Sequence, residues 1–183
     1  MALRHAVLAA LLDGEASGYE LGKRFDRGVG ELWNARPQQV YAELNTLERS
    51  GLIRGREVPQ QGRPTKRVFV PTEAGYAELA RFAADSARPA AHRDDLLVKV
   101  YAADAVDAAS LIAQLRERAA QSRSRAAMLD KVLERLRDGA EETEFLGGSS
   151  RVGPYLACMR GRMFEQDTLH WCLRAIEVLE ARG

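Results

Sequence analysis

A helix that leads directly into a two-stranded hairpin constrains the fold of this chain more than any other feature. Pro37 suits the first position of a helix, where its missing N–H costs nothing, and Gly51 ends that helix. The β-branched segments 52–58 and 67–70 follow, separated by a polar stretch that is long for a hairpin turn. Residues 35–75 are therefore expected to form one structural unit.

Three further helices are expected around this unit. The apolar residues of segment 3–12 follow the spacing of a one-sided helix. Ser17 and Glu20 form a capping box that opens the next helix, and Thr72 caps a helix after the second strand. The order helix, helix, helix, hairpin, helix predicts a winged helix-turn-helix domain over residues 1–88.

Residues 89–183 predict a helical second domain, so the expected fold class is mostly α. A long helix at about 107–138 carries small and apolar residues at 4-3 spacing, which is typical of a coiled-coil seam. The acidic and Gly-Ser segment 139–150 is interpreted as a solvated link. The terminal helix, about 152–180, is apolar on more than one face.

That surplus of apolar surface has two interpretations. A surface helix needs one apolar stripe, so the second face predicts contact with another subunit. An intrachain helical hairpin is the alternative. The residues expected in a dimer interface are Leu156, Met159, Met163, Leu169, Leu173 and Ile176.

The charge distribution indicates one surface that faces phosphates. Residues 49–67 contain six basic side chains and one acid, a net charge of +5, in a chain whose formal net charge is +1. A local positive patch on a nearly neutral protein favours nucleic-acid binding. A solvated charge run is the alternative interpretation.

The remaining composition argues against catalysis and metal binding. His5, His92 and His170 lie far apart, and the sequence has no Gly-rich phosphate loop. Cys158 and Cys172 are fourteen residues apart in a helical pattern, so they are expected to stay reduced, and with His170 they spread around the helix rather than forming a zinc site. We expect no enzyme activity, no cofactor and no metal. Without a membrane span or a targeting signal, the expected location is the cytoplasm.

The sequence resembles the PadR family of bacterial transcriptional regulators. The resemblance rests on the SGYEL, Pro-x-x-x-Tyr and Gly-Arg-Pro elements, which occur together and in order. The matching stretches are VLAALLDGEASGYEL (7–21), ELWNARPQQVYAELNTLERSGLI (31–53), GRPTKRVFVPTEAG (62–75) and, more loosely, RDDLLVKVY (93–101). The resemblance implies a winged-helix domain followed by the multi-helix C-terminal dimerisation domain of the family's longer branch. It also implies a homodimer that represses transcription and is often released by a small, frequently aromatic, molecule.

The residues themselves suggest how DNA would be read. Gln38 and Gln39 are expected to contact bases, because amides near the N-terminal end of a helix pair bidentately with adenine. Arg63 suits a narrow minor groove, whereas Lys66 and Arg67 suit phosphates. The set expected to contact DNA is Arg36, Gln38, Gln39, Tyr41, Asn45, Arg49, Arg63, Lys66 and Arg67.

An effector pocket is expected near the dimer helices. The side chains expected to line it are Trp33, Tyr155, His170 and Trp171, each of which also suits a hydrophobic core. The predicted function is a homodimeric regulator that binds a pseudo-palindromic operator, represses its own or a neighbouring operon and is released by a small aromatic effector. A winged-helix protein-interaction module within a larger assembly is the alternative.

Overall fold

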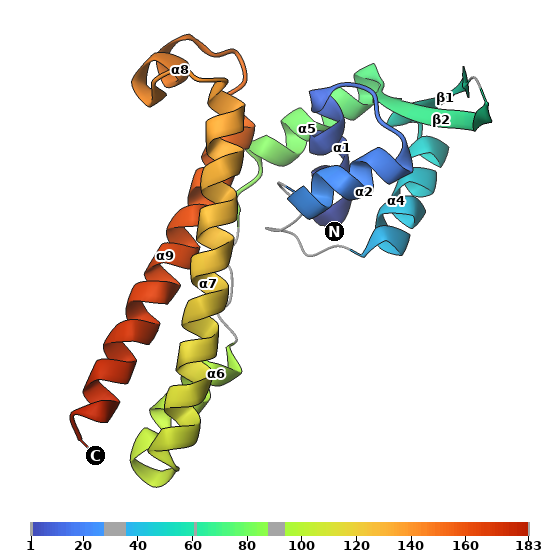
Figure 1. The fold of residues 1–183 in the computed structure, drawn as a ribbon. Coiled ribbons are helices and arrows are strands. Elements are labelled where there is room, and N and C mark those ends of the chain that lie inside the picture. Colours follow the sequence, from blue (N-terminus) through green and yellow to red (C-terminus); the bar gives the residue numbers. More distant parts are fainter. Residues whose placement is uncertain (1, 28–35, 61, 88–93, 183) are drawn as a thin grey trace. The chain divides into compact units, whose positions relative to one another are not determined.

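The computed structural model describes residues 2–27, 36–60, 62–87 and 94–182 (Figure 1). The chain divides into two compact units, Met1–Arg88 and Pro89–Gly183, which are described separately below. Both are built mainly from helices, and the first also carries a two-stranded sheet. Within the described ranges, no helix combines the length and the apolar character needed to cross a membrane.

Helices α1 (Ala2–Ala10), α2 (Gly18–Arg27) and α4 (Pro37–Arg49) form the first part of the N-terminal unit. The capping box opens α2 as predicted. The Glu20 N–H donates to the Ser17 hydroxyl oxygen at 3.3 Å, and the Ser17 N–H donates to the Glu20 carboxylate at 2.9 Å. Two of the backbone N–H groups that a helix start leaves without a partner are thereby satisfied.

The hairpin is longer than predicted and its turn is shorter. Strand β1 (Ile53–Gln60) pairs antiparallel with β2 (Arg63–Pro71), whereas the β-branched pattern predicted only 52–58 and 67–70. The polar residues between those segments continue the strands, because backbone pairing does not need apolar side chains. Gly62 adopts a φ of +69°, as a tight turn requires. Residues with a Cβ atom adopt this backbone conformation only with strain.

Helix α5 (Glu73–Ala84) follows the hairpin and begins as predicted at Thr72, whose hydroxyl accepts from the Gly75 N–H at 3.2 Å. Two apolar side chains from the helices predicted at the N-terminus are exposed. The 3₁₀ turn that follows α1 breaks the helical spacing at Leu12, which is 49% exposed, and Tyr19 is 64% exposed on α2. The buried apolar residues of the unit include Val7, Leu8, Leu11, Leu21, Val40, Leu44, Leu47, Ile53 and Phe69.

The C-terminal unit is built around an antiparallel pair of long helices, α7 and α9, which pack along each other (Figure 1). The intrachain hairpin considered as an alternative is therefore part of the fold. The helices of this unit are α6 (Asp95–Tyr101), α7 (Ala108–Arg137), α8 (Glu142–Gly148) and α9 (Gly153–Glu180), with a 3₁₀ turn at Ala103–Ala105.

The seam of α7 differs slightly from the predicted pattern. Its buried residues are Leu111, Leu115, Ala119, Ser122, Ala126, Leu129 and Leu133. Three other residues at the same 4-3 spacing, Ala108, Ile112 and Leu136, are only half-buried. Leu111 takes the inward position that the strict heptad spacing gave to Ile112.

Two apolar clusters join α7 to α9. One contains Leu115 and Cys172, and the other contains Leu133 and Tyr155. The segment 139–150, interpreted above as a solvated link, instead contains helix α8. Phe145 of α8 packs on the second cluster, with its ring centroid 5.1 Å from that of Tyr155.

Gly18 and Tyr41, from two of the sequence elements that carry the family resemblance, meet in the N-terminal unit. A Cβ atom at Gly18 would lie 2.2 Å from Cε1 of Tyr41. The glycine therefore lets the tyrosine ring of α4 lie directly against the start of α2.

Gly18→Ala is expected to lower the free energy of unfolding by about 1–3 kcal/mol, because the added methyl group overpacks the Tyr41 contact. Gly22→Ala is the matched control, since nothing lies within 4 Å of a Cβ at Gly22. At that helical position alanine should stabilise by about 0.5–1 kcal/mol. Urea unfolding of both variants measures the difference, and equal effects would show that the Tyr41 contact is unimportant.

Candidate nucleic-acid interface

The burial of α4 determines which of its side chains face outward. Val40, Leu44 and Leu47 are at most 1% exposed, so they occupy the inner side of the helix. The exposed side chains on the rest of the helix and its cap include Arg36, Gln38, Gln39, Tyr41, Asn45 and Arg49. The six residues predicted on this element are therefore all accessible to a ligand of the N-terminal unit.

The two glutamines differ in availability. The Arg36 N–H donates to Oε1 of Gln39 at 2.9 Å, so this amide already caps the start of α4. A bidentate contact from Gln39 to adenine would have to break that hydrogen bond. Gln38 is exposed and makes no side-chain hydrogen bond within the described residues, which makes it the better base-reading candidate of the two.

The other candidates on α4 are partly engaged. Nε of Arg49 donates to the Asn45 carbonyl at 3.3 Å, which folds the arginine back along the helix. Tyr41 is 48% exposed, with its ring against Gly18 and its hydroxyl available for a phosphate.

Two of the three hairpin cations predicted to contact DNA, Lys66 and Arg67, form ion pairs with acids. Lys66 Nζ lies 2.5 Å from a carboxylate oxygen of Glu20, and Arg67 Nη2 lies 2.8 Å from one of Glu48. The side chain of Arg63, at the start of β2, lies outside the described part of the structure.

Arg56, one of the six basic residues in segment 49–67, also forms an ion pair with an acid. Nη2 of Arg56 lies 2.5 Å from a carboxylate oxygen of Glu15. Including the three acids reduces the net charge of this region from +5 to +2. The sequence window that begins at Arg49 left out Glu48, and it gave no sign that Glu15 and Glu20 would fold onto the hairpin.

Glu20 titrates unusually because of this arrangement. The hydrogen bond from Lys66, aided by the one from the Ser17 N–H, lowers the pKa of Glu20 from 4.5 to about 2. The carboxylate is therefore charged throughout the neutral range, and Lys66 keeps its partner there.

Among the predicted effector residues that the structure describes, Tyr155 and Trp171 belong to different apolar clusters. Trp33 lies outside the described residues. Tyr155 is 3% exposed and its hydroxyl donates to Glu142 at 2.9 Å, so it belongs to the core of the C-terminal unit. His170 is exposed on α9, and Trp171 is half-buried and lines a cavity.

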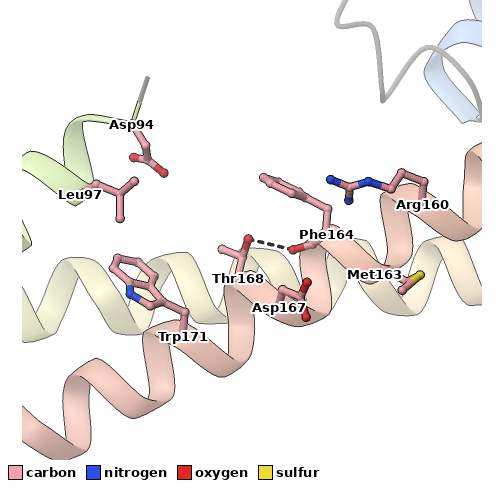
Figure 2. Close-up of a pocket in the computed structure, with 8 residues that line it drawn as sticks. All are labelled: Asp94, Leu97, Arg160, Met163, Phe164, Asp167, Thr168 and Trp171. Carbon is pink, nitrogen blue, oxygen red and sulfur yellow. Dashed lines mark hydrogen bonds between the residues drawn. The ribbon is translucent and has the colours of Figure 1, made fainter. Parts of the chain in front are cut away.

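That cavity of about 400 Å³ lies in the C-terminal unit between α9 and the start of α6 (Figure 2). Asp94 forms part of one wall, and two hydrogen bonds fix its carboxylate. One oxygen accepts from the Leu96 N–H at 2.9 Å and the other from Arg118 at 3.0 Å. The remaining lining is a mixture of apolar and charged side chains, which sequence reasoning did not bring together. The lining residues are Asp94, Leu97, Arg160, Met163, Phe164, Asp167, Thr168 and Trp171.

The predicted dimer residues on α9 differ in their exposure. Leu156, Met163 and Leu173 are 44%, 50% and 39% exposed, so they present apolar surface on α9. Met159 and Leu169 are half-buried against the intrachain clusters. Ile176, at 8% exposed, packs into the α7–α9 core and offers little surface to a partner.

Comparison with known proteins identifies the family. A model described as the transcriptional regulator PadR-like family matches residues 7–81, and one described as virulence activator alpha C-term matches residues 92–180. A probable transcriptional regulator of Mycobacterium tuberculosis is 33% identical over the full length of both chains. The chain belongs to the PadR-like family. Membership makes it a transcriptional regulator rather than an enzyme, and the second match agrees with the family's longer branch.

Other PadR-like proteins share its length and fold. The negative transcriptional regulator PadR of Bacillus subtilis is 25% identical over 92% of each chain. The structure of that PadR with operator DNA aligns with a TM-score of 0.81 at 22% identity, covering 98% of this chain and 99% of the other. Its complex with p-coumaric acid aligns at 0.75 and 23% identity, covering 98% and 96%. The predicted winged helix with a helical C-terminal domain is thereby confirmed.

Glu20→Gln is expected to lower the free energy of unfolding by about 1 kcal/mol near neutral pH, a modest value because both partners of the ion pair are partly exposed. The pKa of Glu20 in the folded protein lies below the ordinary value of 4.5. Its stabilising contribution is therefore complete above that value and is lost as the pH falls toward about 2. Urea unfolding of both proteins across this range measures the difference. A difference that stays constant with pH would contradict the assignment.

Proposed function

We propose that this PadR-like regulator binds operator DNA as a homodimer through α4 and the β1–β2 hairpin. The accessible polar face of α4, with Gln38 at its N-terminal end, carries this proposal. A helix of this kind reads base edges in the major groove, while a hairpin beside it contacts the backbone or the minor groove. The operator complex of Bacillus subtilis PadR supports the assignment by its similar fold.

Dimerisation gives the binding its geometry. Two α4 helices about 34–36 Å apart, or a multiple of that spacing, enter successive major grooves on one side of the duplex, so the operator is a pseudo-palindrome. The exposed Leu156, Met163 and Leu173 of α9 supply apolar surface for the pairing.

The proposed outcome is repression of the regulator's own or a neighbouring operon. The Bacillus subtilis relative is a negative regulator, whereas the family model of the C-terminal part is described by a virulence activator. Repression follows when the operator overlaps the promoter. A gel shift with duplexes tiling the DNA upstream of the regulator's own gene locates the operator and separates this function from a protein-interaction module.

Gln38→Ala is expected to weaken operator binding by about 1–3 kcal/mol, because the amide reads a base edge, and to leave a mixed-sequence duplex unaffected. Lys66→Ala should weaken binding to both duplexes and lower the slope of affinity against salt by about 1. Fluorescence anisotropy with both duplexes measures these effects. Unchanged operator affinity of the Gln38 variant would remove α4 from the base-reading role.

We also propose that the cavity at Trp171 binds a small aromatic effector. Phe164 and Trp171 offer aromatic surface, and Arg160, Asp167 and Thr168 offer polar groups that fix orientation (Figure 2). Release from DNA requires that the effector bind the non-binding arrangement of the dimer more tightly than the DNA-bound one.

The chain has two tryptophans, so the fluorescence of Trp171 at this cavity can be measured apart from that of Trp33. In a Trp33→Phe variant, Trp171 is the sole tryptophan, and p-coumaric acid or a related phenolic or planar compound is expected to quench its fluorescence and weaken operator binding. A Trp171→Phe variant is the control. Quenching in that control alone, or no quenching by any compound after inner-filter correction, would contradict an effector site at this cavity.

A further inference from the structure

The Glu48–Arg67 ion pair occupies a place that strand β1 leaves open for it. Oε1 of Glu48 accepts from the Gly55 N–H at 3.0 Å and from Nη2 of Arg67 at 2.8 Å. A Cβ atom at Gly55 would lie 2.6 Å from Oε1 of Glu48 and 2.7 Å from Nε of Arg67. The strand backbone therefore positions the carboxylate, and the missing side chain makes room for the pair.

The other two carboxylates are also positioned by their own elements. Glu20 is held by the Ser17 N–H at 2.9 Å and the Ser17 hydroxyl at 3.0 Å. The loop that carries Glu15 is tied by Arg24, whose guanidinium donates to the Ala10 carbonyl at 2.9 Å and to the Gly14 carbonyl at 3.1 Å. The carboxylate of Glu20 and the loop of Glu15 are therefore held by contacts other than those with their cations.

These pairs neutralise cations on both faces of the hairpin. Successive residues of a strand point to opposite faces, so Lys66 and Arg67 lie on different sides. Arg56 lies opposite Val68 in the antiparallel register, which places it on the same face as Lys66. No face of the hairpin presents its full complement of positive charge to a ligand.

A role in stability alone does not explain three such pairs. Exposed ion pairs contribute little, typically about 0–1 kcal/mol each. The hairpin is already anchored through Val68 and Phe69, which are 3% and 6% exposed. The carboxylates also act on a ligand, because each one must be displaced before its cation binds a phosphate fully.

We propose that Glu15, Glu20 and Glu48 limit sequence-independent DNA binding by competing with phosphates for Arg56, Lys66 and Arg67. Sequence-independent binding draws its free energy from phosphate contacts, so it depends most on these cations. Operator binding also gains from the base contacts of α4 and depends on them less. A genome offers a large excess of competing sites, so this restraint increases occupancy of the operator. The inference rests on the proposed DNA-binding function.

Glu48→Gln and Glu15→Gln are the informative variants, because glutamine keeps an oxygen acceptor and removes the charge. Each is expected to raise affinity for a mixed-sequence duplex of about 30 base pairs by about three- to fivefold, the range of an exposed ion pair. The salt slope should steepen by about 0.9 for each cation released. Anisotropy titrations over a series of salt concentrations, with thermal melts as a check on folding, measure both quantities.

Glu73→Gln is the matched control. Glu73 is exposed in the first turn of α5, outside the hairpin, and forms no ion pair in the described structure. Its replacement changes the net charge by the same amount, and the effect is expected to stay below about twofold, since it frees no cation. If Glu73→Gln matched the other two variants, net charge rather than pairing would be responsible and the inference would be wrong.

Two other results are decisive. Folded Glu48 and Glu15 variants with wild-type affinity and salt slope would overturn the inference while the DNA-binding function stands. If neither wild type nor variants bound any duplex, including upstream DNA, at low salt of about 50 mM, the proposed function itself would be wrong and the inference with it.

Discussion

The burial of one stripe of α4 determines the chemistry available to the N-terminal unit. Val40, Leu44 and Leu47 pack into the core, and that packing leaves the amide and basic side chains of the same helix in solvent. Hydrophobic burial supplies the free energy, and the helical repeat determines which residues face outward. The hairpin depends on the same core, since Ile53 and Phe69 pack against this stripe.

A second constraint is electrostatic and acts on the surface that the core creates. Acids from a loop, from α2 and from α4 meet basic residues of the hairpin, so the folded unit is less positive than its hairpin sequence. Charges of this kind affect association and its salt dependence more than they affect stability. In the proposed account, α4 provides sequence recognition, and the acids keep the hairpin from binding every duplex equally well.

Sequence reasoning predicted the order of elements in the N-terminal unit and the outward face of α4, because capping residues and apolar spacing are local signals. It underestimated the length of the hairpin, since polar residues such as Lys66 pair through their backbone and leave no apolar pattern. It missed α8, whose Phe145 gains stability only from a cluster formed by distant residues. Local patterns do not report such tertiary contacts.

The candidate site shows the same division. The exposure of Gln38 follows from the periodicity of its helix, whereas the capping bond of Gln39 and the burial of Tyr155 depend on where other atoms lie. The ion pairs of the hairpin join residues that are 19 to 46 positions apart in the sequence. For the two most distant pairs, Arg56 with Glu15 and Lys66 with Glu20, no local sequence pattern indicates that the partners meet.

Hydroxyl-radical footprinting of the operator, combined with sedimentation of the complex, determines whether two α4 helices of a dimer bind one operator. We expect two protected patches on one face of the duplex, separated by about 10 base pairs or a multiple of that spacing, and two protein chains per operator. A single protected patch with one chain bound would contradict this expectation.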